Sequence, residues 1–273
     1  MKAKPSHKIS SNTLSNPGSG SIRKTDCNAY LGQWPFRETR YTEPASLIEL
    51  MDSMHITQAC VTPVNGLFYK DVHRANLQLS EMIKEYRTRL LPFCVINPFY
   101  PGWKEDLQTC VDRLGAKAIA LYPSLHNYSL QSPQCGELLT LLGSMHIPAA
   151  LSERIEDERG EHWHFKIPNI KPDEIIRTVQ NFPKTKFIIR DAFILNYEKL
   201  SGKNWLIDFS RTDITLSHAN MKWVKKSIDR FTFGTQMPLK TPLPAIYKIE
   251  KSDMDAKLQK KIFSENLLKF LSR

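Results

Sequence analysis

The chain has 273 residues, a hydrophobic content of 41% and a formal net charge of +10, which suits one domain with a single sizeable core. No stretch approaches the roughly 20 consecutive apolar residues of a membrane span, so we expect no membrane partner. The basic residues are scattered, and their densest runs, 222–226 and 257–261, have the pattern of solvated helix faces, so we expect no nucleic-acid partner.

The N-terminal segment, residues 1–24, is rich in Ser, Lys, Asn, Pro and Gly and has no continuous apolar run. It predicts a disordered or strap-like tail ahead of a barrel domain over residues 25–273, and not a secretory signal. The five cysteines include no Cys-x-x-Cys pair, and Cys60 and Cys94 lie within apolar runs. This usage argues against a disulfide framework or a zinc ribbon and favours a reducing, cytoplasmic location.

Short apolar runs alternate with amphipathic stretches along the rest of the chain. The runs that predict strands are 24–30, 56–62, 89–97, 116–122, 147–151, 186–190, 205–209 and 230–234. The stretches that predict helices are 44–54, 72–86, 103–114, 133–146, 172–181, 217–227 and 255–271. Continuous apolar strands separated by helices indicate a parallel sheet with crossover helices. Eight such units predict an α/β fold, a single (β/α)8 TIM barrel, and the absence of Gly-x-Gly-x-x-Gly after the first strand argues against a dinucleotide fold.

Polar residues follow most of the expected strands, at the level where a barrel places its functional groups. Together they predict a pocket, although any single one also suits a strand-terminating turn. Alternation along the first strand puts Asp26, Asn28 and Tyr30 on one face. The candidate catalytic residues are Asp191, Glu153, Arg190 and Tyr30. The candidate substrate-binding residues are Asn28, Trp34, Arg37, Asn97, Tyr122, Ser152, Asp208 and Gln236.

These residue types fit metal-free chemistry on a small anionic molecule. Arg37 or Arg190 could hold a carboxylate or phosphate through the guanidinium fork. A buried Glu153 or Asp191 could act as a general acid or base, and a tyrosine at the strand ends could donate a proton. The structural alternative is that Arg190 and Asp191 pair with neighbours and stabilise the barrel mouth.

The order of several short motifs resembles the amidohydrolase-related family of metal-dependent hydrolases and decarboxylases. Where that family has Asp-x-His-x-His-x-Gly at its first strand, this chain has Asp-Cys-Asn-Ala-Tyr-Leu-Gly at 26–32. The segment 231–238 is similar to the family's Phe-Gly-Ser-Asp-x-Pro, and Glu265 and Asn266 are similar to the Glu-Asn of its last helix. The resemblance covers residues 25–271, implies a hydrolase-like or lyase-like TIM barrel, and is compatible with a homodimer.

The family's metal ligands are replaced in this chain. The positions of its five ligands carry, in chain order, Asn28, Tyr30, Ser152 or Glu153, Asp191 and Gln236. A divalent ion needs several converging imidazole and carboxylate donors. The resemblance therefore implies a degenerate metal site, and we expect neither a metal nor another cofactor.

Three functions remain open. The first is a metal-independent hydrolase-like or lyase-like enzyme for a small anionic substrate, and the second is a non-catalytic pseudoenzyme that binds a small ligand or a protein partner. The third is a metal enzyme with ligands from Glu153, Asp191, His162 and His164, which ranks last because alternate residues on a loop need not converge. A closed pocket that brings the candidate acids and Arg190 together would favour the first, and side chains that plug the mouth would favour the second.

Overall fold

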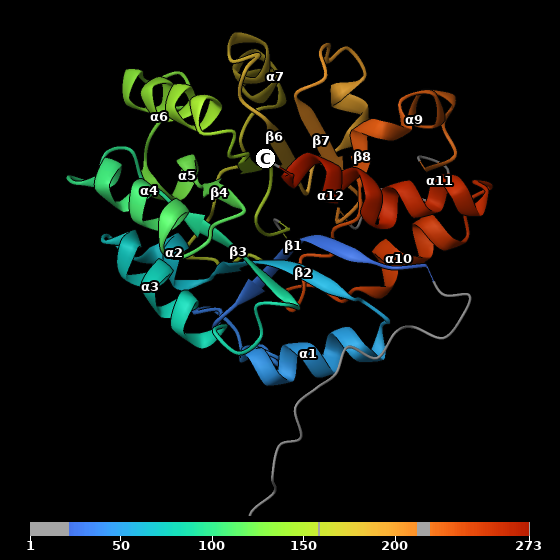
Figure 1. Cartoon of the computed structure of the whole chain (residues 1–273), viewed down its shortest axis with the longest axis horizontal. Helices are drawn as coiled ribbons and strands as arrows, with labels where there is room; N and C mark the ends of the chain where they lie inside the picture. Colours follow the sequence, from blue (N-terminus) through green and yellow to red (C-terminus); the bar gives the residue numbers. More distant parts are fainter. Residues whose placement is uncertain (1–21, 158, 212–218, 273) are drawn as a thin grey trace, which may run out of the picture.

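The computed structural model describes residues 22–157, 159–211 and 219–272. Eight parallel strands follow one another in chain order around a barrel, and helices form an outer ring (Figure 1). The backbone nitrogen of Cys27 donates to the oxygen of Phe233 (3.0 Å) and that of Tyr30 donates to the oxygen of Met237 (2.8 Å), which joins the last strand region to the first. The predicted (β/α)8 TIM barrel is confirmed.

The elements follow the predicted order. The strands are β1 (Thr25–Leu31), β2 (Gln58–Pro63), β3 (Leu90–Val95), β4 (Ala118–Leu121), β5 (Ala149–Ser152), β6 (Phe187–Arg190), β7 (Trp205–Asp208) and β8 (Phe231–Thr232). The main helices are α1 (Pro44–Ser53), α3 (Val72–Met82), α4 (Trp103–Asp112), α6 (Pro133–Ser144), α7 (Pro172–Asn181), α9 (Lys222–Lys226), α10 (Leu243–Glu250), α11 (Ala256–Lys260) and α12 (Asn266–Leu271). A π-helical turn (Lys261–Glu265) joins α11 to α12, so the expected helix 255–271 is nearly continuous.

Several elements depart from expectation. Helix α10 and the short elements α2 (Asn65–Phe68), α5 (Pro123–His126) and η1 (Ile194–Tyr197) occupy segments without a predicted helix. The predicted helix 217–227 begins within residues that the structure does not describe. The predicted tail, 1–24, also lies almost wholly outside the described residues.

The strands are buried on both faces, as their continuous apolar runs predict. Alternate residues such as Ile119 and Leu151 pack outward in one apolar cluster with the helices. The remaining residues point inward and form what we call the lumen cluster, which includes Cys27, Tyr30, Cys60, Phe93, Val95, Ala118, Ala120, Tyr122, Ala150, Ile188 and Leu206. The barrel interior is therefore packed with side chains below its mouth.

Strand β1 does not alternate as predicted. Its pairing with β2 shifts between Asp26 and Ala29, which is the mark of a β-bulge. The extra residue changes the phase of the strand, so Cys27 and Tyr30, three residues apart, both join the lumen cluster. Asp26 bonds instead to Thr235, beyond β8, and Asn28 bonds to Asp208 at the end of β7.

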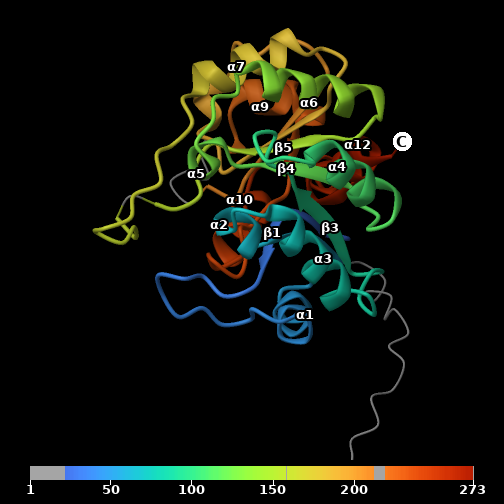
Figure 2. The ribbon, with the colours of Figure 1, turned by 90° about the vertical axis from the view of Figure 1, so that its left-hand side faces the viewer.

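Two long loops project from the carboxyl end of the barrel. Figure 2 shows the loop after β1, in blue, and the loop after β5, in yellow-green, extending on the same side of the molecule. These loops frame the mouth on which the candidate site opens. Among the described residues, no helix combines the length and apolarity needed to cross a bilayer.

Candidate functional site

A buried polar layer crosses the lumen at the carboxyl ends of the strands. Each of its side chains is at most 3% exposed, and they come from five different strand ends: Tyr30, Thr62, Tyr122, Ser152 and Arg190. Polar groups at this depth need partners, because burial removes their bonds to water. The layer is therefore a built feature of the barrel mouth.

Arg190 connects this layer from one side of the barrel to the other. It lies at the end of β6, and its Nη2 donates to the phenol oxygen of Tyr122 (2.9 Å) while its Nη1 donates to the hydroxyl of Thr62 on β2 (3.3 Å). The guanidinium carbon is 5.9 Å from the ring centroid of Tyr30 and 5.8 Å from that of Tyr122. Both distances suit cation–π contacts. The phenol of Tyr122 also donates to that of Tyr30 (3.3 Å).

The charge of Arg190 has no carboxylate partner in the part of the chain that the structure describes. The guanidinium is fully buried, and its Nε receives no partner from the same residues. A guanidinium stays protonated in proteins, so this is a buried positive charge surrounded by hydroxyls and aromatic rings. Burial also raises the pKa of Tyr30 well above its ordinary value, so that phenol stays neutral.

A second network surrounds Asp191. Its side chain is fully buried, Lys240 Nζ lies 2.9 Å from its Oδ1, and Arg154 Nε lies 3.0 Å from its Oδ2. These cations come from the loops after β8 and β5, so Asp191 joins two loops at the mouth. Its backbone φ of +48° is in the left-handed region, which is uncommon for a residue with a Cβ.

Asp208 ties the ends of three strands together. Its Oδ2 accepts from Asn28 Nδ2 of β1 (3.1 Å), and its Oδ1 accepts from the backbone nitrogen of Asp191 after β6 (2.9 Å). Ser210 donates to the same carboxylate through its hydroxyl (2.9 Å). Burial and then the nearby charge of Asp191 raise the pKa of Asp208 above its ordinary value.

Asp26 plays the same role where the barrel closes. It accepts from the backbone nitrogens of Asn28 (2.7 Å) and Thr235 (3.1 Å) and from the Thr235 hydroxyl. Complete burial outweighs these bonds and raises the pKa of Asp26 to about 7. The closure between β1 and β8 therefore contains a carboxyl group that titrates near neutral pH.

Glu153 does not join Arg190. Its Oε2 accepts from the phenol of Tyr197 (2.8 Å), and its Oε1 pairs with Arg211 Nη1 (2.6 Å). Burial raises the pKa of Glu153 above its ordinary value. Of the four candidate catalytic residues, only Arg190 and Tyr30 share a cluster, while Asp191 and Glu153 each have a separate set of partners.

The loop residues divide into those at the mouth and those outside it. Trp34 and Gln236 are each 1% exposed, and Gln236 Nε2 donates to the backbone oxygen of Ile155. Arg37 is more open, with a side-chain exposure of 39%, and pairs with Glu156. Asn97 accepts from the backbone nitrogen of Phe99 (3.0 Å) and so stabilises the turn after β3.

No family model and no curated protein matches the chain. Solved structures do match it. A 2,6-dihydroxybenzoate decarboxylase from Rhizobium gives a TM-score of 0.71 at 14% identity, over 92% of this chain and 99% of that one. A dihydroxybenzoic acid decarboxylase from Polaromonas, with bound manganese and 2-nitroresorcinol, gives 0.71 at 15% identity, over 92% and 97%. A 5-carboxyvanillate decarboxylase from Sphingomonas paucimobilis gives 0.68 at 12% identity, over 92% and 99%. The chain shares the barrel fold of these decarboxylases.

The donor set at the mouth does not fit a divalent metal. The positions that the motif comparison assigns to metal ligands hold two amides, a phenol, either the Ser152 hydroxyl or the Glu153 carboxylate, and Asp191. Glu153 is already paired with Arg211. Asp191 is already bonded to Lys240 and Arg154, so a metal ion beside it would face two positive charges. Among the described residues, no three His, Cys, Asp or Glu side chains gather as metal ligands would.

His162 and His164, on the loop after β5, contact each other and Phe36 rather than Asp191 or Glu153. His162 Nδ1 accepts from the backbone nitrogen of His164 (3.3 Å), and the His162 ring stacks on Phe36 with centroids 5.9 Å apart. Both histidines are exposed. The pair belongs to the loops over the mouth.

Sequence reasoning missed the partners of the candidate residues. Lys240, Arg154 and Arg211 supply the cations for Asp191 and Glu153, and Thr62 and Thr235 supply hydroxyls to Arg190 and Asp26. Thr62 lies within β2, and Arg154, Arg211 and Thr235 lie two or three residues beyond a strand end, whereas Lys240 lies eight residues beyond β8. The strand-end rule could have selected the first four, but Lys240 has no local signal in the sequence.

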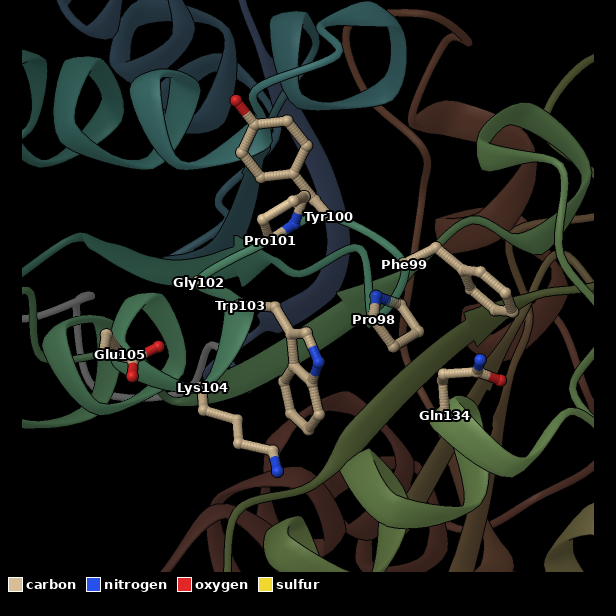
Figure 3. Close-up of a pocket in the computed structure, with 9 residues that line it drawn as sticks. All are labelled: Pro98, Phe99, Tyr100, Pro101, Gly102, Trp103, Lys104, Glu105 and Gln134. Atoms are coloured by element: carbon tan, nitrogen blue, oxygen red, sulfur yellow. The ribbon is translucent and has the colours of Figure 1, made fainter.

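A separate cavity of about 390 Å³ opens outside this layer, between the loop after β3 and the start of α6 (Figure 3). Residues 98–105 and Gln134 line it. Phe99, which is 48% exposed, stacks on Tyr128 at its edge with ring centroids 5.7 Å apart. None of the candidate catalytic residues lines this cavity.

Proposed function

We propose that the chain is a metal-independent, lyase-like or hydrolase-like barrel protein whose substrate is a small carboxylate held by Arg190. The observation that carries the proposal is the fully buried guanidinium, which has hydroxyl and aromatic partners but no carboxylate partner among the described residues. A carboxylate would satisfy both the charge and the unused Nε in the fork geometry that arginine favours.

Tyr30 and Tyr122 are the groups with a transferable proton in direct contact with this guanidinium. Their phenols could orient a bound carboxylate or donate a proton to a reacting atom beside it. Asp191 and Glu153 are less suited to proton transfer than their positions in the sequence suggest, because both accept from fixed cations. The proposed reaction therefore relies on the tyrosines and Arg190.

A second candidate is a non-catalytic protein that binds the same kind of anion. The ion pairs of Asp191 and Glu153 favour it, because they occupy the two carboxylates that would serve as acid and base. Trp34 and Gln236, which follow β1 and β8, are also buried, as expected where side chains fill a barrel mouth.

Binding and turnover measurements on the full chain separate these candidates. Benzoate binding should appear by calorimetry in the wild type and weaken about 10- to 100-fold in Arg190→Met. Release of CO2 from 2,6-dihydroxybenzoate that persists in excess chelator would support the enzyme. Binding without turnover of any carboxylate tested would support the binding protein, and the absence of carboxylate binding would refute both.

A further inference from the structure

Two buried amide side chains at the mouth have oxygens that accept no hydrogen bond from the described residues. They belong to Asn28, which is fully buried, and Gln236, which is 1% exposed, and the atoms are Oδ1 and Oε1. Their NH2 groups are both engaged. Asn28 Nδ2 donates to Asp208 Oδ2 and Ser210 Oγ, each at 3.1 Å, and Gln236 Nε2 donates to the backbone oxygen of Ile155.

These contacts determine which way each amide points. Turning over the amide of Asn28 would place its oxygen against the Asp208 carboxylate, and turning over that of Gln236 would place its oxygen against a carbonyl. Both changes bring two acceptors together. The network therefore fixes two oxygens as acceptors, and a buried acceptor without a donor is unfavourable.

Both residues lie at the carboxyl end of the barrel, the end at which β6 places Arg190. The backbone nitrogen of Gln236 donates to the backbone oxygen of Asn28 (2.6 Å), so the two residues are neighbours where the barrel closes. The side chain of Gln236 then crosses to Ile155, which follows β5 and belongs to the lumen cluster. Asn28 reaches Asp208 on β7, the strand beside the β6 strand that carries Arg190.

We propose that Asn28 and Gln236 form an acceptor subsite for the same ligand. Their amide oxygens would accept hydrogen bonds from a donor group on a small carboxylate. This inference rests on the proposed function, since Arg190 holds the carboxylate. The donor is a hydroxyl, whose single proton can satisfy one of the two amide oxygens, or an ammonium group, which can satisfy both. The ligand is thus a hydroxy acid or an amino acid rather than a plain carboxylic acid.

Three molecules of nearly equal size test this subsite. Propionate, glycolate and glycine all carry a carboxylate, and at the far position they present a methyl, a hydroxyl and an ammonium group. Ligand-observed NMR titration of the full chain measures each Kd. We expect glycolate or glycine to bind at least about tenfold more tightly than propionate, as one or two buried hydrogen bonds allow. Whichever of the two binds more tightly identifies the donor.

The variant Gln236→Met removes the acceptor but keeps the length of the side chain. It should reduce the Kd ratio of propionate to the favoured ligand, because only the Asn28 acceptor remains, and comparing ligands within one variant cancels any change in stability. Gln134→Met makes the same replacement at an exposed position on α6 and should leave the ratio unchanged.

The outcomes separate the two proposals. Equal binding of all three ligands, together with its weakening in Arg190→Met, would overturn the acceptor subsite and leave the carboxylate site standing. A ratio that is unchanged in Gln236→Met would also overturn the subsite. Failure of every carboxylate to bind would refute both, and the wild-type comparison decides the matter even if Gln236→Met does not fold.

Discussion

Arg190 donates to the phenol oxygen of Tyr122 across 2.9 Å, from the end of β6 to the residue that follows β4. The same guanidinium reaches Thr62 on β2, so one side chain bonds to both sides of the lumen. A fully buried cation is expensive unless it is compensated. The hydroxyls and aromatic rings around Arg190 offset only part of the free energy lost when its charge is buried. Arg190 therefore lowers the stability of the free protein while it supplies the charge that a ligand would bind.

The variant Arg190→Met should separate binding from stability. Loss of a charge-assisted contact should weaken benzoate binding about 10- to 100-fold. The free energy of unfolding should change by less than about 2 kcal/mol, because relief of the buried charge offsets the lost bonds to Tyr122 and Thr62. Urea denaturation and calorimetry check both values. Arg190→Lys, which keeps the charge without the fork, should bind with intermediate affinity, and unchanged benzoate binding in Arg190→Met would contradict the proposed site.

Lys240 and Asp191 should be strongly coupled. Asp191→Ala leaves the 14%-exposed Lys240 ammonium without this carboxylate and should lower the free energy of unfolding by about 3–5 kcal/mol. Lys240→Met alone should cost less, because Asp191 keeps its bond to Arg154. The double variant should be more stable than the sum of the single changes predicts, by at least about 1 kcal/mol. Additive effects in urea denaturation would show that the pair is not coupled.

Asp26 should make stability fall as pH rises. Its pKa is about 7 in the folded barrel against an ordinary value of 3.8, so between these values the folded state binds more protons than the unfolded state. Ionisation of Asp26 therefore costs stability, and the full cost is present above the folded pKa. Asp26→Asn removes this cost and should gain up to about 4 kcal/mol over the wild type at about pH 8, but little at about pH 4. An equal difference at both pH values in denaturant melts would contradict the assignment.

The sequence predicts the barrel well because its strands are buried on both faces. Runs such as Phe187–Arg190 and Trp205–Asp208 are apolar and bounded by helices, and local patterns are sufficient to order them. The sequence does not predict which side chains of β1 point into the barrel. Periodicity alone contains no sign of the bulge after Asp26, so alternation misplaces Asn28 relative to Tyr30.

The sequence predicts which residues lie at the mouth of the barrel, but not which side chains they contact. The rule that functional groups follow barrel strands selects Arg190, Asp208 and Gln236 correctly as buried groups at the mouth. It does not reveal that Asp191 meets Lys240, because that contact depends on the path of a loop from the far side of β8. Contacts between loops have no periodic signature, so the ion pairs at the mouth appear only in three dimensions.

Gly234 is required by the position of Asp208. A Cβ on Gly234 would lie 2.4 Å from Asp208 Oδ2 and 3.0 Å from its Cβ, so the carboxylate network would have to shift. Gly234→Ala should therefore lower the free energy of unfolding by about 1–3 kcal/mol, which thermal melting can measure. Gly136→Ala is the matched control, because its Cβ would meet Phe182 at an ordinary 3.5 Å inside α6. That variant should be neutral or stabilised by up to about 1 kcal/mol, and similar losses in both would contradict the clash.

The loops after β1 and β5 should limit how fast a ligand reaches Arg190. Phe36 stacks on Phe165 with ring centroids 4.7 Å apart, and Arg37 pairs with Glu156, so the loops hold each other above the buried Trp34. Phe165→Ala removes an aromatic contact of about 0.5–1.5 kcal/mol and should raise the association rate of benzoate about 2- to 10-fold.

Stopped-flow tryptophan fluorescence can measure this rate in the full chain. Trp163→Ala is the control, because Trp163 lies on the same loop, is 76% exposed and contacts the rings of His162 and His164 rather than those of Phe36 and Phe165. The control should keep the wild-type rate. Equal association rates in the wild type and Phe165→Ala would show that the ligand does not enter between these loops.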